Sequence, residues 1–291
     1  MNAMKTIVIT GIDGSGKSVV AKRLHDKLSG CGMNISLVEC PEYHASGIDT
    51  PLNKLSLALD LFSSRSDEIQ SYALKSVAMF LQMTLFGPIV EYIQAKENPE
   101  QIILSRHALF DTLVYGQIYR ELLNGGWNFT KNDLTNVREF INAAIESGYE
   151  QIENLIRTEN ERLGIAVTLE SYCGYLEKLF YQNNECLIES LIKHFQTTVP
   201  DTVIILDYDV ETVYRRIERR SSDGKEMHET QQTLEKLREL YTQTVSYLEN
   251  RYHDFSVHQI QGSKRSIDDI VSLIIDRLSA SDPAGWAILK Q

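Results

Sequence analysis

The chain has 291 residues, a formal net charge of −11 and a sequence pI near 5.2. Its content of 43% hydrophobic and 24% charged residues is that of a globular protein with a sizeable core, which excludes disorder as the default. The acidic balance argues against the broad basic face that binding a nucleic-acid polymer needs, so an anionic ligand requires a local cluster of positive groups.

Strand and helix signals alternate through the first part of the chain. Short apolar, β-branched segments predict strands at residues 5–10, 34–40 and 101–105. Apolar residues at helical spacing predict helices at 18–28, 68–94 and 109–123, the second of them kinked or split at Gly87 and Pro88.

The second part of the chain adds two strands, at residues 202–207 and 255–260. Continuous apolar strands separated by helices predict a parallel sheet covered on both faces. Residues 124–199 show helical spacing without a strand-like run, so two to four helices are expected there, inserted after the fourth helix. We therefore expect one α/β domain over 1–291, with a five-stranded parallel sheet and a helical insertion whose role stays open.

Two further features concern the cell compartment. The four cysteines show neither a Cys-x-x-Cys pair nor a metal-ligand spacing, which indicates reduced thiols. No apolar run approaches the roughly 18 to 20 residues of a membrane span, and the N-terminal residues lead directly into a strand without the pattern of a signal peptide. We expect a cytoplasmic protein that has no membrane partner.

The stretch GIDGSGKS carries the spacing Gly11-x-x-x-x-Gly16-Lys17-Ser18 between a predicted strand and a predicted helix. Its glycines let successive backbone N–H groups face one anion, and the following helix adds its positive end. This predicts a phosphate-binding P-loop formed by Gly11, Ile12, Asp13, Gly14, Ser15, Gly16, Lys17 and Ser18. Lys17 would reach the β- and γ-phosphates of ATP, and the Ser18 hydroxyl would bind Mg²⁺.

An arginine-rich segment follows the fourth predicted strand, with Arg215, Arg216, Arg219, Arg220 and Lys225 in the stretch VYRRIERRSSDGKE. Such a run can be a solvated helical face with charge pairs four residues apart. Downstream of a phosphate-binding loop, it favours a lid over residues 215–229 that closes on the transferring phosphate. GTPases, ATPases and sulfotransferases use similar loops, but the chain lacks the Asn-Lys-x-Asp motif of a GTPase.

Five stretches of the chain resemble the thymidylate kinase family of P-loop nucleoside monophosphate kinases. They are IVITGIDGSGKS, VECPEYHASG, IILSRHALFDTLVYGQ, PDTVIILDYDVETVYRRIERR and LEKLRELY. The resemblance covers roughly residues 5–120 and 200–280 and implies the P-loop kinase fold, whereas the helical stretch between them is longer than the family needs. It also implies ATP and Mg²⁺ as cofactors, a small-molecule nucleotide acceptor with dTMP as the first expectation, and a homodimer.

The same resemblance implies roles for individual residues. Asp13 would accept a hydrogen bond from the 3′-hydroxyl of the acceptor sugar, although an aspartate that only caps the turn is the alternative. Arg106 would bind the acceptor phosphate or the transferred phosphoryl group. The transition-state cation would come from the lid, where Arg216 and Arg220, or Lys225, are the candidates.

Further residues would form the acceptor pocket. Phe80 would stack on the base, or else be an ordinary core aromatic, and Gln82 could offer its amide to a base edge. Glu42 and Tyr43 would line the pocket, unless they belong to a plain surface loop.

Two positions depart from the family pattern. Ser105 stands where the family has an acidic residue near the metal, which Asp207 or Glu39 would have to replace, and Thr84 stands where an arginine commonly reads the base. The stretches SRHALFDTLVYGQ and FLQMTL and the helical segment ahead of Pro200 also resemble deoxyribonucleoside kinases, although those enzymes usually carry a different P-loop with alanines. Two other functions stay open. One is a deoxyribonucleoside kinase, whose acceptor carries no phosphate, and the other is a catalytically weak nucleotide-binding sensor or partner-binding protein.

Overall fold

The structure, a computed structural model, describes residues 5–219, 226, 228–281 and 286. The chain forms two compact units. Unit 1 comprises the chain up to Glu39, Ile93–His107 and the chain from Val199 onward, and unit 2 comprises Cys40–Tyr92 and Ala108–Thr198. The single domain over 1–291 stays a prediction.

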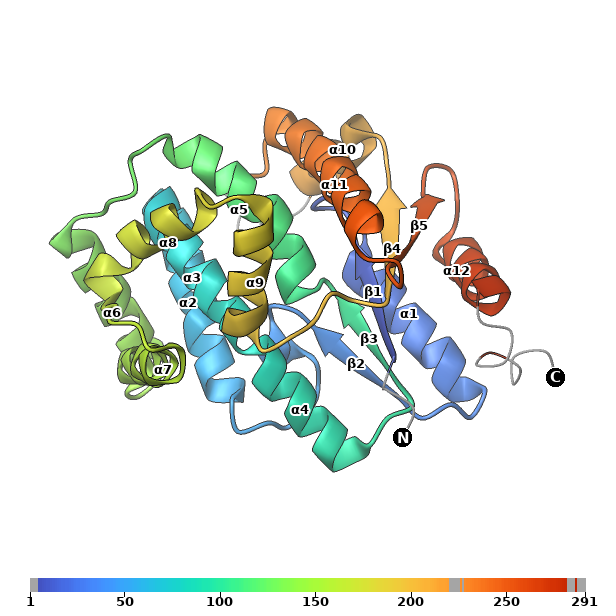
Figure 1. The fold of residues 1–291 in the computed structure, drawn as a ribbon, viewed down its shortest axis with the longest axis horizontal. Helices are drawn as coiled ribbons and strands as arrows, with labels where there is room; N and C mark the ends of the chain where they lie inside the picture. The colour runs from blue at the N-terminus through green and yellow to red at the C-terminus, as the bar shows by residue number, and fades with distance from the viewer. Residues whose placement is uncertain (1–4, 220–225, 227, 282–285, 287–291) are drawn as a thin grey trace. The chain divides into compact units, whose positions relative to one another are not determined.

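Unit 1 contains the sheet (Figure 1). Its strands are β1 (Lys5–Thr10), β2 (Ile35–Glu39), β3 (Gln101–Ser105), β4 (Thr202–Asp207) and β5 (Ser256–Gln261). They lie in the order β2-β3-β1-β4-β5 and all pair in parallel, which confirms the expected five-stranded parallel sheet. Because β1 is central, the loop that follows it begins in the middle of the carboxyl edge of the sheet.

Burial explains why these segments form strands. All five residues of β3 are buried, and Ile102, Ile103 and Leu104 have no exposed surface. Burial of each such side chain stabilises the fold by about 1.5–3 kcal/mol. The edge strand β5 is half-exposed and more polar, as expected for a strand with one neighbour.

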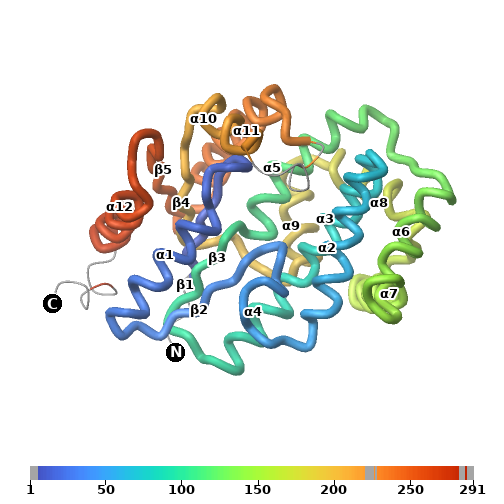
Figure 2. Tube along the Cα trace, turned by 180° about the vertical axis from the view of Figure 1, so that it is seen from behind, coloured from blue at the N-terminus to red at the C-terminus, as the bar shows by residue number. Residues whose placement is uncertain are grey.

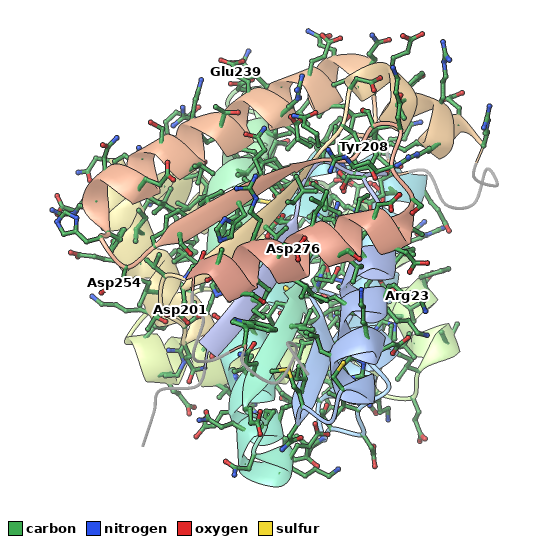
Figure 3. All side chains as sticks on the ribbon, turned by 90° about the vertical axis from the view of Figure 1, so that its right-hand side faces the viewer. Arg23, Asp201, Tyr208, Glu239, Asp254 and Asp276 are labelled. Carbon is green, nitrogen blue, oxygen red and sulfur yellow. The ribbon has the colours of Figure 1, made fainter. Side chains whose placement is uncertain are left out.

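Helices cover both faces of the sheet in unit 1. They are α1 (Lys17–Gly30), α10 (Val210–Glu218), α11 (Gln231–Arg251) and α12 (Ile267–Ser281). The helices α1 and α12 pack together on one face, and α11 and α12 lie on either side of β5, with Glu239 and Asp276 labelled on them in Figure 3. The Tyr241 hydroxyl accepts a hydrogen bond of 3.2 Å from the Thr10 hydroxyl and so connects α11 to β1.

Unit 2 is helical. Its α-helices are α2 (Asn53–Glu68), α3 (Tyr72–Thr84), the first part of α4 (Phe86–Glu97), α5 (Ala108–Leu123), α6 (Lys131–Ala144), α7 (Gly148–Leu163), α8 (Tyr172–Phe180) and α9 (Asn184–Phe195). Two short 3₁₀ turns, η1 (Tyr43–Ala45) and η2 (Leu169–Ser171), complete it. The helices α2 and α3 run side by side, α6 and α7 pack against α2, and α8 packs against α3 and α5 (Figure 2). Residues 124–199 thus contain four α-helices, within the expected number.

Two expectations about helices are corrected. The helix expected at 68–94 begins only at Tyr72, because Glu68 ends α2 and the Ser71 side chain caps α3 by accepting from Leu74 N. The split expected at Gly87 and Pro88 occurs at Leu85, and Pro88 is accommodated in the first turn of α4, where its missing N–H is not needed. The insertion follows the fifth α-helix and not the fourth, because α2 adds a helix that the sequence did not predict.

A third correction concerns apolar runs. The segment Tyr72–Glu97 is long and apolar enough to cross a membrane by composition, with a mean hydropathy of 1.5 in its most apolar window. However, 83% of that window is buried inside the protein, as in the core helix of a folded domain.

Candidate functional site

The phosphate-binding loop, Gly11–Ser18, leads from the end of β1 into α1 in unit 1. A Cβ atom on Gly11 would lie 2.6 Å from the Leu206 carbonyl oxygen, so a larger residue does not fit there. Gly16 has a φ of +85°, and no atom of the described residues lies within 4 Å of the place that its Cβ would occupy. The loop therefore packs closely against β4 on one side and leaves open space in front of the α1 N-terminus.

Lys17 is the first residue of α1, and its side chain is buried in the loop. Its ammonium group donates to the carbonyl oxygens of Gly11 and Ile12, both at 3.0 Å. The hydroxyl of Ser15 is buried and finds no hydrogen-bond partner among the described residues. A buried polar atom without a partner is costly, and a phosphate oxygen at the helix N-terminus would satisfy it.

The carboxylate of Asp13 joins the loop to two other segments of unit 1. Arg106 Nη2 donates to its Oδ1, the Lys17 ammonium lies 3.6 Å from the same oxygen, and His228 Nε2 lies 3.3 Å from Oδ2. Burial alone would raise the pKa of Asp13, but the charges of Arg106 and Lys17 and the contact with His228 outweigh it and hold the pKa well below its usual range. Two fixed cations against one carboxylate form the local positive cluster that an acidic protein needs to hold phosphate.

The backbone of Arg106 adds a second indication of function. Its φ is +78°, a conformation that residues other than glycine rarely adopt, and its N–H donates to the Ile9 carbonyl at 3.0 Å. Strained backbone of this kind concentrates at functional sites, where it holds a side chain in a required direction. In this conformation the guanidinium group of Arg106 contacts Asp13 of the phosphate-binding loop.

His228 is a site residue that the sequence analysis missed. Its side chain is 2% exposed, and its Nδ1 lies 3.5 Å from a carboxylate oxygen of Glu226. The residue falls within the segment 215–229 that was expected to form a lid, but no spacing in that segment distinguishes it. Only the fold brings it to Asp13, 215 positions away in the sequence.

The hydroxyls of Ser18 and Ser105 lie 3.2 Å apart, so Ser105 does occupy the place beside the expected magnesium ligand. Asp207 is not available to replace an acidic residue there, because it accepts hydrogen bonds from Arg238 at 2.8 and 3.1 Å and from Gln259 at 2.9 Å. Glu39 is paired with Ser105 in the sheet register and is the nearest acidic position on β2. The hydroxyl oxygens of Ser18 and Ser105 are of the ligand type that Mg²⁺ binds, and phosphate oxygens and water would supply the remaining ligands.

The residues expected to form the lid are placed only in part. Arg216 lies on α10 with its guanidinium carbon 4.4 Å from the centre of the Tyr208 ring, and Arg215 pairs with Glu211 on the exposed face of the same helix. Arg220 and Lys225 lie outside the described residues. The lid over 215–229 stays a prediction.

Unit 2 contains a small pocket lined by residues of α3, α5 and α8. Its lining combines apolar and polar side chains, among them Met79, Phe80, Met83, Asp111, Tyr115 and Phe180. The sequence analysis did not single out Asp111 of this lining, since one aspartate in a helix gives no signal. Phe80 lines this pocket and also belongs to an aromatic cluster with Tyr172, Phe180, His194 and Phe195.

The other expected acceptor residues of unit 2 lie elsewhere. Gln82 and Thr84 are buried on α3 outside the pocket lining, and the Thr84 hydroxyl donates to the Leu81 carbonyl of its own helix at 2.6 Å. Tyr43 is buried with its hydroxyl 3.2 Å from the Cys40 sulfur, whereas Glu42 is exposed. The structure therefore brings Asp13, Lys17 and Arg106 together in unit 1, and in unit 2 it places only Phe80 of the expected base-binding residues on the pocket.

The fold is similar to that of thymidylate kinase from Candida albicans, with a TM-score of 0.52 and 16% identity over 96% of this chain and 92% of that chain. Deoxyadenosine kinase from M. mycoides, in a structure with the product dCMP, has a TM-score of 0.47 and 18% identity over 94% and 99% of the two chains. No family model and no curated protein sequence matches the chain. The likeness to thymidylate kinase confirms, for the fold, the resemblance that the sequence motifs indicated.

Proposed function

We propose that the protein is a nucleotide kinase that transfers the γ-phosphoryl group of ATP to a deoxynucleoside monophosphate, with dTMP as the first acceptor to test. The observation that carries this proposal is the cluster in unit 1 at the carboxyl edge of the parallel sheet, where Lys17 and Arg106 contact the loop. In the same loop the buried Ser15 hydroxyl has no hydrogen-bond partner in the part of the chain that the structure describes. Phosphoryl transfer asks a protein mainly for positioning and charge neutralisation, which such a cluster supplies.

The loop would act on the donor. Its backbone N–H groups and the positive end of α1 would hold the β- and γ-phosphates. Lys17 would exchange its two carbonyl partners for phosphate oxygens, because a charge-assisted bond to an anion is stronger than one to a neutral carbonyl. Mg²⁺, when bound through Ser18, would neutralise charge between these phosphates.

Arg106 would bind the acceptor phosphate or the phosphoryl group in transfer, and Asp13 would accept from the 3′-hydroxyl of the sugar. Phe80 would stack on the base, as the resemblance of the sequence motifs implies. Arg216 and Arg220 of the lid would add cations in the transition state and exclude water. We further expect a cytoplasmic homodimer that acts on small molecules.

An ADP-release assay with Mg·ATP and a panel of nucleosides and nucleoside monophosphates tests this proposal. Lys17→Ala should lower turnover about 100-fold or more, because a buried cation that contacts the transferring group is lost. Lys22→Ala is the matched control, since Lys22 is an exposed lysine of the same helix. Turnover with nucleosides but with no nucleoside monophosphate would indicate a deoxyribonucleoside kinase. ATP binding without turnover would indicate a nucleotide-binding sensor.

A further inference from the structure

His228 is a buried histidine of unit 1 to which the proposed reaction assigns no role. Backbone hydrogen bonds fix the chain around it directly before α11. The Thr230 N–H donates to the His228 carbonyl at 2.8 Å, and the Glu229 N–H donates to the Glu226 carbonyl at 3.0 Å. Thr230 in turn caps α11, because its hydroxyl accepts from Thr233 N at 3.2 Å. The start of a long helix therefore holds the imidazole in its place.

The imidazole donates a hydrogen bond to the phosphate-binding loop, with its Nε2 3.3 Å from Oδ2 of Asp13. Although burial raises the pKa of Asp13, the charges of Arg106 and Lys17 hold it well below its usual range, so this carboxyl group is ionised. An ionised carboxylate only accepts hydrogen bonds, and His228 Nε2 must therefore carry the proton. A neutral imidazole with its N–H on Nε2 meets this requirement.

The backbone of the loop has little room to move around Asp13. A Cβ atom on Gly14, whose φ is +77°, would lie 2.9 Å from Cγ1 of Val213 and 3.0 Å from Cγ1 of Ile217, both on α10. On another side Gly11 lies against the backbone at the end of β4. Close packing of this kind resists a shift of the loop, so the direction of the Asp13 carboxylate depends on rotation of its side chain.

That rotation affects how firmly the two cations of the site are held. Arg106 Nη2 and the Lys17 ammonium both face Oδ1 of Asp13, whereas His228 contacts Oδ2. A carboxylate that offers both of its oxygens to one guanidinium forms a paired contact, which is stronger than a single hydrogen bond. Because His228 engages Oδ2, the second oxygen is kept from Arg106 and Lys17. Both cations can then exchange Asp13 for phosphate at a lower cost.

From these observations, and resting on the proposed function, we infer that His228 is a positioning residue that acts through Asp13. It holds one carboxylate oxygen away from Arg106 and Lys17 and thereby raises the affinity of the loop for the phosphates of ATP. The donor on the imidazole ring carries this role, and the volume of the ring does not.

Titration calorimetry of the full chain with Mg·ATP, without an acceptor, measures this affinity. His228→Phe fills the space without a donor and should bind ATP about 10-fold more weakly, within the range of a hydrogen bond to a charged group. His228→Ala, which introduces no clash, should show the same loss. His228→Gln keeps an N–H donor and should recover most of the affinity. In the Asp13→Asn background, which lacks the carboxylate, His228→Phe should change the affinity by less than about 2-fold.

His25→Phe is the matched control, because His25 of α1 is also a histidine of unit 1 whose ring nitrogen lies 3.2 Å from an aspartate oxygen, that of Asp26. Its affinity for ATP should equal that of the wild type. An unchanged affinity in His228→Phe and His228→Ala, no recovery in His228→Gln, or an equal loss in the Asp13→Asn background would each overturn the inference. The proposed function would survive any of these results if the wild type phosphorylates an acceptor. A wild-type protein that binds no ATP would overturn both.

Discussion

Arg106 and Asp13 form an ion pair in which the arginine side chain is 19% and the aspartate side chain 9% exposed. The pair connects the residue after β3 to the phosphate-binding loop after β1. A phosphate that binds Arg106 must therefore compete with the carboxylate of Asp13. The Asp13 carboxylate thus lowers the affinity of the site for an anion.

A double-mutant cycle measures this relationship. Asp13→Ala and Arg106→Ala should each lower the free energy of unfolding by about 3 kcal/mol, because each leaves a shielded charge without its main partner. The coupling energy between them should be about 1–3 kcal/mol by urea denaturation. The exposed pair of Arg23 and Asp268, at 2.7 Å, is the control and should show no measurable coupling. Equal coupling in the two pairs would contradict a special role for the buried one.

His228 should matter to catalysis through Asp13. We expect His228→Ala to lower kcat/KM about 10-fold, because the carboxylate loses the donor on its second oxygen. His228→Gln keeps an N–H donor and should recover most of that loss. Steady-state kinetics of both variants, with thermal unfolding alongside, is the measurement. Equal activity of the two variants would mean that the N–H donor at this position contributes nothing to catalysis.

Ser105 should limit the affinity for the metal. Because its hydroxyl lies 3.2 Å from that of Ser18, Ser105→Asp would place a carboxylate beside the expected magnesium ligand. The affinity for Mn²⁺ in the presence of ADP, followed by electron paramagnetic resonance, should rise several-fold, whereas Ser105→Ala should leave it unchanged or weaker. Weaker binding in Ser105→Asp would place the metal elsewhere.

Two buried histidines should make stability depend on pH. Burial lowers the pKa of His107 to about 3, and burial with the nearby Arg162 charge lowers that of His194 to about 4. In the unfolded chain the pKa of each histidine is about 6.5. Below that pH the unfolded chain binds protons that the folded chain does not. The free energy of unfolding therefore falls as the pH drops from about 6.5 toward 4.

Urea unfolding at pH 7.5 and pH 5.0 checks this. Between these values each histidine should contribute a loss on the order of 2 kcal/mol. His107→Gln and His194→Gln should each reduce the pH dependence by that amount, whatever they do to stability at pH 7.5. An unchanged dependence in the two buried variants would mean that these histidines take up protons in the folded protein.

The strands and the phosphate-binding loop could be predicted because their signals are local. The segments 5–10, 101–105 and 202–207 are short β-branched runs between breakers, and the structure has these bounds unchanged. The helix α2 was missed because its polar and apolar residues mix, and its face is covered only once α6 and α7 pack on it.

By itself, the sequence determined the parallel sheet and the strand–loop–helix position of the segment from Gly11 to Ser18, since strand pattern and loop spacing depend on neighbouring residues. The tertiary structure alone decided that His228 meets Asp13, that Asp207 is held by Arg238, and that Phe180 lies on Gly116. The physical reason is distance along the chain. Such contacts join segments whose pairing follows from how the whole core packs, and no local spacing records them.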